Sequence, residues 1–194
     1  MRSRYPVFAA ATIAVLLLIV AFARASGTRP ADAPVRGNFS LAEARAASGL
    51  DLYWAGASIV GLPLTAVERR GDSARYVSFL YGDCPASDHQ GCPLPLEIQT
   101  WPACVRNLSL YDAGDPFSPR PEWSQVRKAP AGIFDEGRQV ELQTGSSTVV
   151  IFGETRALVN RAAAALRGVN NPDRPGEPLR PPVAGAVEGD LACP

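Results

Sequence analysis

Residues 79–101 read FLYGDCPASDHQGCPLPLEIQTW, in which two apolar runs enclose a short polar loop. In the second run Leu96 and Ile98 alternate with Glu97 and Gln99, the pattern of a strand that buries one face. The first run is rich in aromatic residues, which favour strands. The stretch therefore predicts an antiparallel hairpin, and this hairpin indicates the fold class.

The hairpin loop contains Cys84 and Cys92, and Cys104 and Cys193 complete the four cysteines of the chain. Hairpin pairing would bring the Cα atoms of Cys84 and Cys92 within the roughly 4.4–6.8 Å that a disulfide needs. A predicted strand separates Cys92 from Cys104, and it would hold them about 40 Å apart if fully extended. We therefore expect a Cys84–Cys92 disulfide and, by elimination, a Cys104–Cys193 disulfide.

A zinc site is the alternative for the same loop. Cys84, His89 and Cys92, with Cys104 further along, are the ligand types of a site with three cysteines and one histidine. Their spacing lacks the paired C-x-x-C knuckles of common structural zinc sites, and an oxidising compartment works against free thiolates. The disulfide interpretation is preferred, and we expect no metal or other cofactor.

Outside the hairpin, the sequence predicts a helix, a series of strands and a second helix. Ser40 and Glu43 match the capping-box pattern at the start of a helix over 40–48. A helix is also predicted over 154–167, where apolar residues recur on one face. Short strands are predicted within 52–69 and over 75–82, 95–101, 125–128, 132–134, 139–144 and 148–152. This order predicts an α+β domain with a mainly antiparallel sheet and both helices packed on one face.

The N-terminal segment gives the strongest signal in the chain. Arg2 and Arg4 precede the 19 uncharged residues 5–23. As a helix these would span about 28 Å, close to the ~30 Å hydrocarbon core of a bilayer. The length favours an uncleaved transmembrane anchor, whereas Ala23-Arg24-Ala25 fits the cleavage site of a signal peptide. Both alternatives predict export of the rest of the chain, with the N-terminus in the cytoplasm.

Composition divides the chain into four parts. Residues 1–25 are the anchor or signal peptide, 26–38 a linker, 39–168 the extracytoplasmic α+β domain and 169–194 a proline-rich tail. Because the tail lacks apolar periodicity, we expect it to be extended or disordered except at Cys193.

The charge balance argues against one class of partner. After Arg29 the chain holds 15 basic and 19 acidic residues, a net charge of −4. Binding to a phosphate backbone needs a basic surface, so we expect no nucleic-acid partner.

Aromatic side chains suggest a candidate ligand groove. Aromatic residues make up only 8% of the chain, and the core needs most of them. The candidates for a groove are Tyr53, Trp54, Tyr76, Phe79, Tyr81 and Trp101.

No catalytic motif stands out. His89 is the only histidine, so a Ser-His-Asp or Cys-His mechanism would depend on it. The chain contains no G-x-S-x-G elbow, C-x-x-C pair, G-x-G-x-x-G fingerprint, Walker loop or H-E-x-x-H. A dispersed pair of carboxylates needs no fixed spacing and stays open as the basis of a secreted enzyme.

Several stretches resemble uncharacterised envelope proteins of high-GC bacteria, which are single-pass and membrane-anchored or secreted. These stretches are YVSFLYGDC at 76–84, GCPLPLEIQTWPAC at 91–104 and ELQTGSSTVVIFG at 141–153, followed by the alanine-rich helix. The resemblance covers most of the exported part and implies location and fold. It brings no activity and no catalytic residue.

The leading hypothesis is a non-enzymatic extracytoplasmic domain that binds or scaffolds an envelope protein or a small-molecule ligand. Its N-terminal helix would hold it at the cell membrane, or the domain would be secreted if that segment is cleaved. The alternatives are a secreted enzyme with a dispersed carboxylate site and a zinc or thiol module at Cys84, His89, Cys92 and Cys104.

Overall fold

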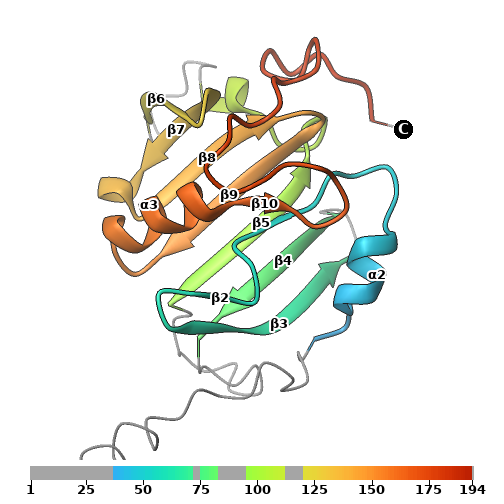
Figure 1. The fold of residues 1–194 in the computed structure, drawn as a ribbon. Coiled ribbons are helices and arrows are strands. Elements are labelled where there is room, and N and C mark those ends of the chain that lie inside the picture. Colours follow the sequence, from blue (N-terminus) through green and yellow to red (C-terminus); the bar gives the residue numbers. More distant parts are fainter. Residues whose placement is uncertain (1–36, 72–74, 83–94, 112–119, 194) are drawn as a thin grey trace, which may run out of the picture. The chain divides into compact units, whose positions relative to one another are not determined.

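The structure is a computed structural model that describes residues 37–71, 75–82, 95–111 and 120–193 (Figure 1). All of these belong to one unit, Pro34–Pro194. The helical elements are α2 (Leu41–Ala46), α3 (Arg156–Ala165) and two 3-10 helices, η1 (Leu108–Tyr111) and η2 (Asp135–Gly137). The strands are β1 (Tyr53–Trp54), β2 (Ser58–Ile59), β3 (Leu62–Arg70), β4 (Tyr76–Tyr81), β5 (Leu96–Pro102), β6 (Glu122–Val126), β7 (Ala129–Phe134), β8 (Gln139–Thr144), β9 (Ser147–Gly153) and β10 (Arg167–Gly168).

Eight strands form one sheet in the order β2-β3-β4-β5-β9-β8-β7-β6, and every neighbouring pair is antiparallel. Strands β2 to β5 form one meander and strands β6 to β9 a second, and the two meanders join where β5 pairs with β9 (Figure 1). Strands β1 and β10 make a separate two-stranded ribbon. The prediction of a mainly antiparallel sheet with a few helices is therefore confirmed.

The hairpin predicted from residues 79–101 is present as β4 and β5, with Phe79 opposite Ile98. Its loop lies outside the described residues. The expected Cys84–Cys92 disulfide therefore stays a prediction.

Both helices begin at capping residues. The Ser40 hydroxyl accepts a hydrogen bond from the Glu43 amide at 3.2 Å, and the Glu43 carboxylate accepts one from the Ser40 amide at 2.7 Å. This is the predicted capping box. Helix α3 follows Thr155, whose hydroxyl accepts from the Leu158 amide at 3.2 Å. Each cap satisfies an amide that the first helical turn would otherwise leave without a partner.

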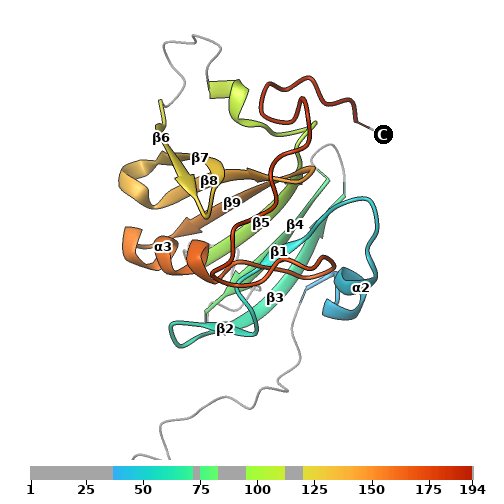
Figure 2. The same ribbon diagram turned by 45° about the horizontal axis from the view of Figure 1, so that its top comes forward.

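The core lies between one face of the sheet and α3, which runs across that face (Figures 1 and 2). From α3, Val159 and Ala162 are fully buried, and Leu166 follows directly after it. Gly153 permits this close packing, because a Cβ atom there would lie 2.8 Å from the Val159 side chain. The strands contribute alternate residues, among them Val77, Phe79, Tyr81, Leu96, Ile98, Val140, Leu142, Val149 and Ile151.

One predicted strand is placed wrongly. The sequence predicts a strand over 125–128, but β6 ends at Val126, and Arg127 and Lys128 form a two-residue turn into β7. Their φ angles are 50° and 70°, in the left-handed region that Gly and Asn normally occupy in such turns. Because neither residue is a turn former, the sequence does not signal this turn.

The proline-rich tail is packed onto the domain rather than disordered. We call residues 169–193 the C-terminal strap. On the core face, the Thr144 hydroxyl donates to the Arg180 carbonyl at 2.9 Å. On the opposite face, the Gln143 amide donates to the Ala186 carbonyl at 2.7 Å. Between these points the strap passes the tip of the β8–β9 hairpin, so it connects the two faces of the sheet.

The strap is held at its start by one guanidinium group. Arg127, in the β6–β7 turn, donates to the carbonyls of Leu166, Arg174 and Glu177. These bonds replace the water that would otherwise solvate an irregular backbone. Specific hydrogen bonds therefore keep the strap ordered, and the spacing of apolar residues in the sequence does not reveal them.

The end of the strap is fixed covalently. Cys193 forms a disulfide with Cys104, with the Cα atoms 5.3 Å apart. This confirms the pairing that was predicted by elimination. The bond connects positions 89 residues apart and ties the strap to the segment that follows β5.

Within the part of the chain that the structure describes, no helix has the length and apolarity needed to cross a membrane. The apolar segment 5–23 is not among those residues.

The contribution of the Cys104–Cys193 disulfide to stability can be measured with a double serine variant. Replacing Cys104 and Cys193 with serine should lower the free energy of unfolding by about 2–4 kcal/mol, because the unfolded chain regains the freedom of a long loop. Thermal unfolding and limited proteolysis measure this, and cleavage should appear first within the strap. An unchanged melting temperature with an intact strap would contradict this account.

Candidate binding face of the sheet

The face opposite the core carries an unusual set of polar and aromatic side chains. We call five of them, which project side by side from β4 and β5, the ladder face: Tyr76, Ser78, Glu97, Gln99 and Trp101. Ser78 is buried, and the other four are partly exposed. On an antiparallel sheet with one face in the core, this is the face that can meet a ligand.

Three of these side chains form a hydrogen-bonded ladder along β5. The Trp101 indole N–H donates to Gln99 Oε1 at 2.8 Å, and Gln99 Nε2 donates to Glu97 Oε1 at 2.8 Å. Ser78, on β4, donates to the same Glu97 oxygen at 2.7 Å. Each bond donates in the direction of Glu97, and among the described residues both donors to this carboxylate reach its Oε1 oxygen. The spacing of two residues along a strand makes these contacts feasible.

Aromatic and cationic groups stack at one end of the ladder. The rings of Tyr76 and Trp101 lie 4.0 Å apart between centroids, with an interplanar angle of 18°. The Arg106 guanidinium lies 5.3 Å from the Trp101 centroid, within cation–π distance. Trp101 therefore has two stacking neighbours and an occupied N–H, which fix its orientation.

A buried carboxylate anchors Arg106. Glu141 has no exposed side-chain surface and accepts bonds from Arg106 Nε at 2.9 Å and Arg106 Nη2, from the Tyr111 hydroxyl at 2.8 Å and from Gln139 Nε2 at 2.7 Å. A buried charge is stable only when it is paired and hydrogen-bonded in this manner. Glu141 is thus committed to the structure and positions Arg106 beside Trp101.

The pKa values of its two partners reflect this arrangement. Burial alone would lower the pKa of Arg106, but the hydrogen bonds and charge of Glu141 outweigh it and raise that pKa above its ordinary value. Burial and the bond to Glu141 raise the pKa of Tyr111 to about 12. Both groups therefore stay protonated under ordinary conditions, with Tyr111 as a donor.

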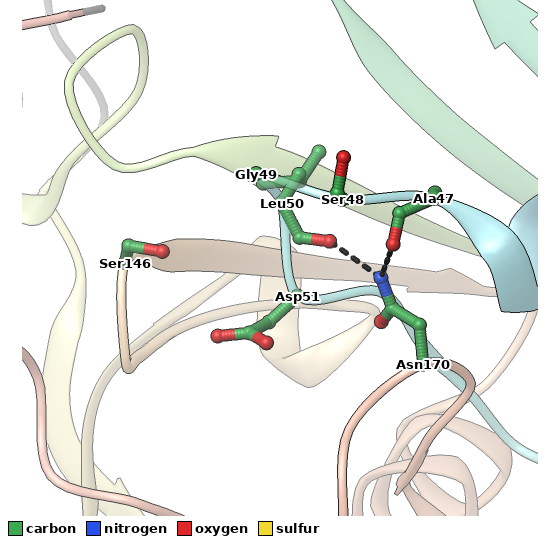
Figure 3. Close-up of a pocket in the computed structure, with 7 residues that line it drawn as sticks. All are labelled: Ala47, Ser48, Gly49, Leu50, Asp51, Ser146 and Asn170. Atoms are coloured by element: carbon green, nitrogen blue, oxygen red, sulfur yellow. Dashed lines mark hydrogen bonds between the residues drawn. The ribbon is translucent and has the colours of Figure 1, made fainter.

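A second candidate is a shallow pocket of about 290 Å³ on the loop that follows α2 (Figure 3). It is lined by Ala47, Ser48, Gly49, Leu50, Asp51, Ser146 and Asn170. Asn170 Nδ2 donates to the carbonyls of Ala47 and Leu50, at 2.9 and 2.8 Å. Asp51 forms an ion pair with Arg180 at 2.9 Å. These polar groups are therefore occupied in holding the loop and the strap together, which makes the pocket a weaker candidate than the ladder face.

The residues expected to line a groove are divided between the two faces of the sheet. Tyr53 and Tyr81 are fully buried on the core side, and the Tyr81 hydroxyl accepts from the Ala55 amide at 2.9 Å. Trp54 packs against Phe79, with 6.2 Å between ring centroids. Tyr76 and Trp101 stand together on the opposite face. The six residues therefore do not form one groove, and only the last two belong to the ladder face.

The zinc or thiol module is only partly described. Cys84, His89 and Cys92 lie outside the described residues. Cys104 is bonded to Cys193, so its sulfur is not a thiolate ligand, and a site that includes Cys104 is contradicted. Among the described residues, no group of three or more His, Cys, Asp or Glu side chains is arranged to hold a metal ion.

Two glutamates of the sheet bear on the alternative of a dispersed carboxylate site. Glu97 and Glu141 point to the same face, but β9 separates their strands, which places them roughly 10 Å apart across the sheet, and the register offsets them by two further residues along it. Glu141 is fully buried and has four donors. Of these two carboxylates, Glu97 is the partly exposed one, and among the described residues it accepts hydrogen bonds at Oε1 alone.

The sequence did not single out Glu141, Arg106 and Tyr111. The alternation in QVELQT, residues 139–144, predicts that Glu141 points away from the core. It does not show that Arg106 and Tyr111, which follow β5, cover this residue. The missed signal is a charged residue on a central strand, which needs a partner from elsewhere in the chain.

Comparison of the chain with protein-family models, curated proteins and solved structures finds no match.

Removing the buried charge tests the role of Glu141. Glu141→Gln should lower the free energy of unfolding by about 3 kcal/mol, because it leaves the Arg106 charge without its partner. Glu97→Gln is the matched control on the same face and should change stability by less than about 1 kcal/mol, since Glu97 is part-exposed and an amide oxygen still accepts its bonds. Urea unfolding compares the two. An equal loss of unfolding free energy in the two variants would show that the buried charge of Glu141 contributes no more to stability than Glu97 does.

Alkaline pH should destabilise the fold. Burial, together with hydrogen bonding to Asp173, raises the pKa of Tyr53 to about 12; burial also raises the pKa of Tyr81, and Tyr111 titrates at about 12. In the unfolded chain these groups titrate near pH 10. Their stabilising contribution is therefore complete below about pH 10 and is lost as the pH rises toward 12. Urea unfolding at several pH values measures this, with Tyr111→Phe reducing the slope. A stability that does not fall over this range would contradict it.

Proposed function

We propose that the protein is a non-enzymatic binding or scaffolding domain of the cell envelope and that it engages its ligand through the ladder face. The observation that carries the proposal is the chain of hydrogen bonds in which Trp101 donates to Gln99 and Gln99 donates to Glu97. It holds part-exposed polar groups in fixed positions on a surface that the core does not use. A preorganised surface loses little entropy on binding, which favours recognition.

The chemistry of the face narrows the ligand class. The Glu97 carboxylate accepts hydrogen bonds from Ser78 and Gln99. The partly exposed Tyr76 ring, which stacks on Trp101, adds an apolar surface. The matching ligand is an extended polar molecule that offers hydrogen-bond donors next to an apolar patch, such as a glycan chain or a basic peptide.

Two features support a location outside the cytoplasm. Residues 5–23 are uncharged and long enough for one membrane-spanning helix. The Cys104–Cys193 disulfide joins distant parts of the fold, and such bonds persist in oxidising compartments. We propose an N-terminal transmembrane helix or signal peptide, with the domain on the outer side of the membrane.

The three tryptophans of the chain provide separate reporters for a binding test. In full-length protein in detergent micelles, the indole N–H signals of Trp54, Trp101 and Trp123 can be followed by NMR. We would titrate with an N-acetylglucosamine oligosaccharide, trilysine and triglutamate. The Trp101 signal should move with a ligand that carries donors and should not move with triglutamate, while Trp54, in the core, stays in place.

The matched variant is Glu97→Gln, which keeps the size and the acceptor oxygen but removes the charge. It should weaken binding about tenfold, the equivalent of one lost charge-assisted hydrogen bond. If no ligand moves Trp101, or if Glu97→Gln binds as tightly as the unchanged protein, the ladder face is not the binding surface.

A further inference from the structure

The two edges of the eight-stranded sheet differ in how their backbone groups are hydrogen-bonded within the chain. At the β3 edge, the Asn38 side chain accepts from the Arg69 amide at 2.8 Å and donates to the Arg69 carbonyl at 3.0 Å. The Val67 carbonyl accepts from the Phe39 amide at 3.3 Å. Strand β2 pairs with the start of β3, and the Ala57 carbonyl accepts from the Leu64 amide at 2.9 Å, so further backbone groups of β3 are bonded within the chain.

The β6 edge has no such cover from the described residues. Four of its five residues, Glu122–Gln125, are exposed, on both faces of the sheet. Trp123 has 49% of its surface exposed. Proteins usually protect an open edge with a bulge, a charged residue pointing inward or a covering segment. Strand β6 pairs with β7 without a bulge and carries one charged side chain, Glu122.

The turn at Arg127 and Lys128 determines which backbone groups point outward. A two-residue turn of this type is flanked by a hydrogen-bonded pair, here Val126 and Ala129. The bonding alternates along an antiparallel pair, so the amides and carbonyls of Trp123 and Gln125 point away from β7. The residue opposite Gln125 is Pro130, which has no N–H to donate, and this agrees with the assignment.

We infer that β6 pairs antiparallel with β6 of a second copy of this chain, about a two-fold axis at Ser124. In this register the amide and carbonyl of Trp123 face those of Gln125 in the second copy, and the reverse holds by symmetry. All four outward donors and acceptors on each strand are then satisfied. A two-fold interface of this kind uses one surface on both subunits.

The side chains agree with the same register. Glu122 lies opposite Val126 of the second copy, so the register places no like charges opposite each other. Trp123 lies against the Gln125 side chain of the second copy and loses part of its exposed surface. Ser124 meets its own copy at a position without backbone bonds, where Cα atoms are about 4.5 Å apart and a small side chain fits.

Single cysteines test both the contact and its register. Ser124→Cys, Trp123→Cys and Gln125→Cys would each be introduced singly into the full-length protein in mild detergent. Arg161→Cys, at an exposed position on α3, is the control that measures crosslinking by random collision. After mild oxidation, non-reducing gels should show the most dimer for Ser124→Cys, several-fold above Arg161→Cys. A yield at 124 no higher than at 161, or a maximum at 123 or 125, would overturn the inference.

A proline variant separates edge pairing from chance proximity. Gln125→Pro removes an N–H that points outward and leaves the β7 bonds intact, whereas Gln125→Ala removes the side chain alone. In the Ser124→Cys protein, the proline should abolish the crosslink and the alanine should preserve it, with unfolding curves confirming that both variants fold. Crosslinking that survives the proline would overturn the pairing, as would loss of the crosslink with both substitutions.

Discussion

The pairing of β5 with β9 is the constraint on which the rest of the structure depends. It runs over seven residue pairs, from Leu96 opposite Gly153 to Pro102 opposite Ser147, and among the described strands it is the pairing that joins the two meanders into one sheet. Because side chains alternate along strands, this register also decides which residues enter the core. A shift of one residue in β5 would move Ile98 out of the core and place Gln99 within it.

Local elements could be predicted from the sequence, whereas their partners could not. The capping box at Ser40 and the β4–β5 hairpin depend on neighbours in sequence, so their signals are local. The β5–β9 pairing is long-range and has no such signal. The six aromatic residues suggested for a groove are divided for a simpler reason. Tyr76 and Tyr81 are five positions apart on one strand, and the alternation of side chains along a strand places them on opposite faces.

The buried polar groups and the C-terminal strap share one physical explanation. Glu141 on a central strand and an irregular proline-rich segment both look solvent-exposed when only apolar periodicity is considered. Arginine makes both compatible with burial: Arg106 neutralises Glu141, and Arg127 donates to three backbone carbonyls. A planar group with five donors can satisfy several acceptors at once, and its partners are set by the tertiary fold.

The inferred edge pairing has a geometric consequence for the ladder face. Trp123 pairs with Gly132, and Gly132 pairs with Glu141, so these residues and the ladder face point to the same side of the sheet. Residues paired across an antiparallel contact share a face, and a β6–β6 contact would therefore direct both ladder faces to the same side of one continuous sheet. An extended ligand with repeated units could then contact two copies at once, and avidity would compensate for the modest affinity of a flat, partly exposed surface.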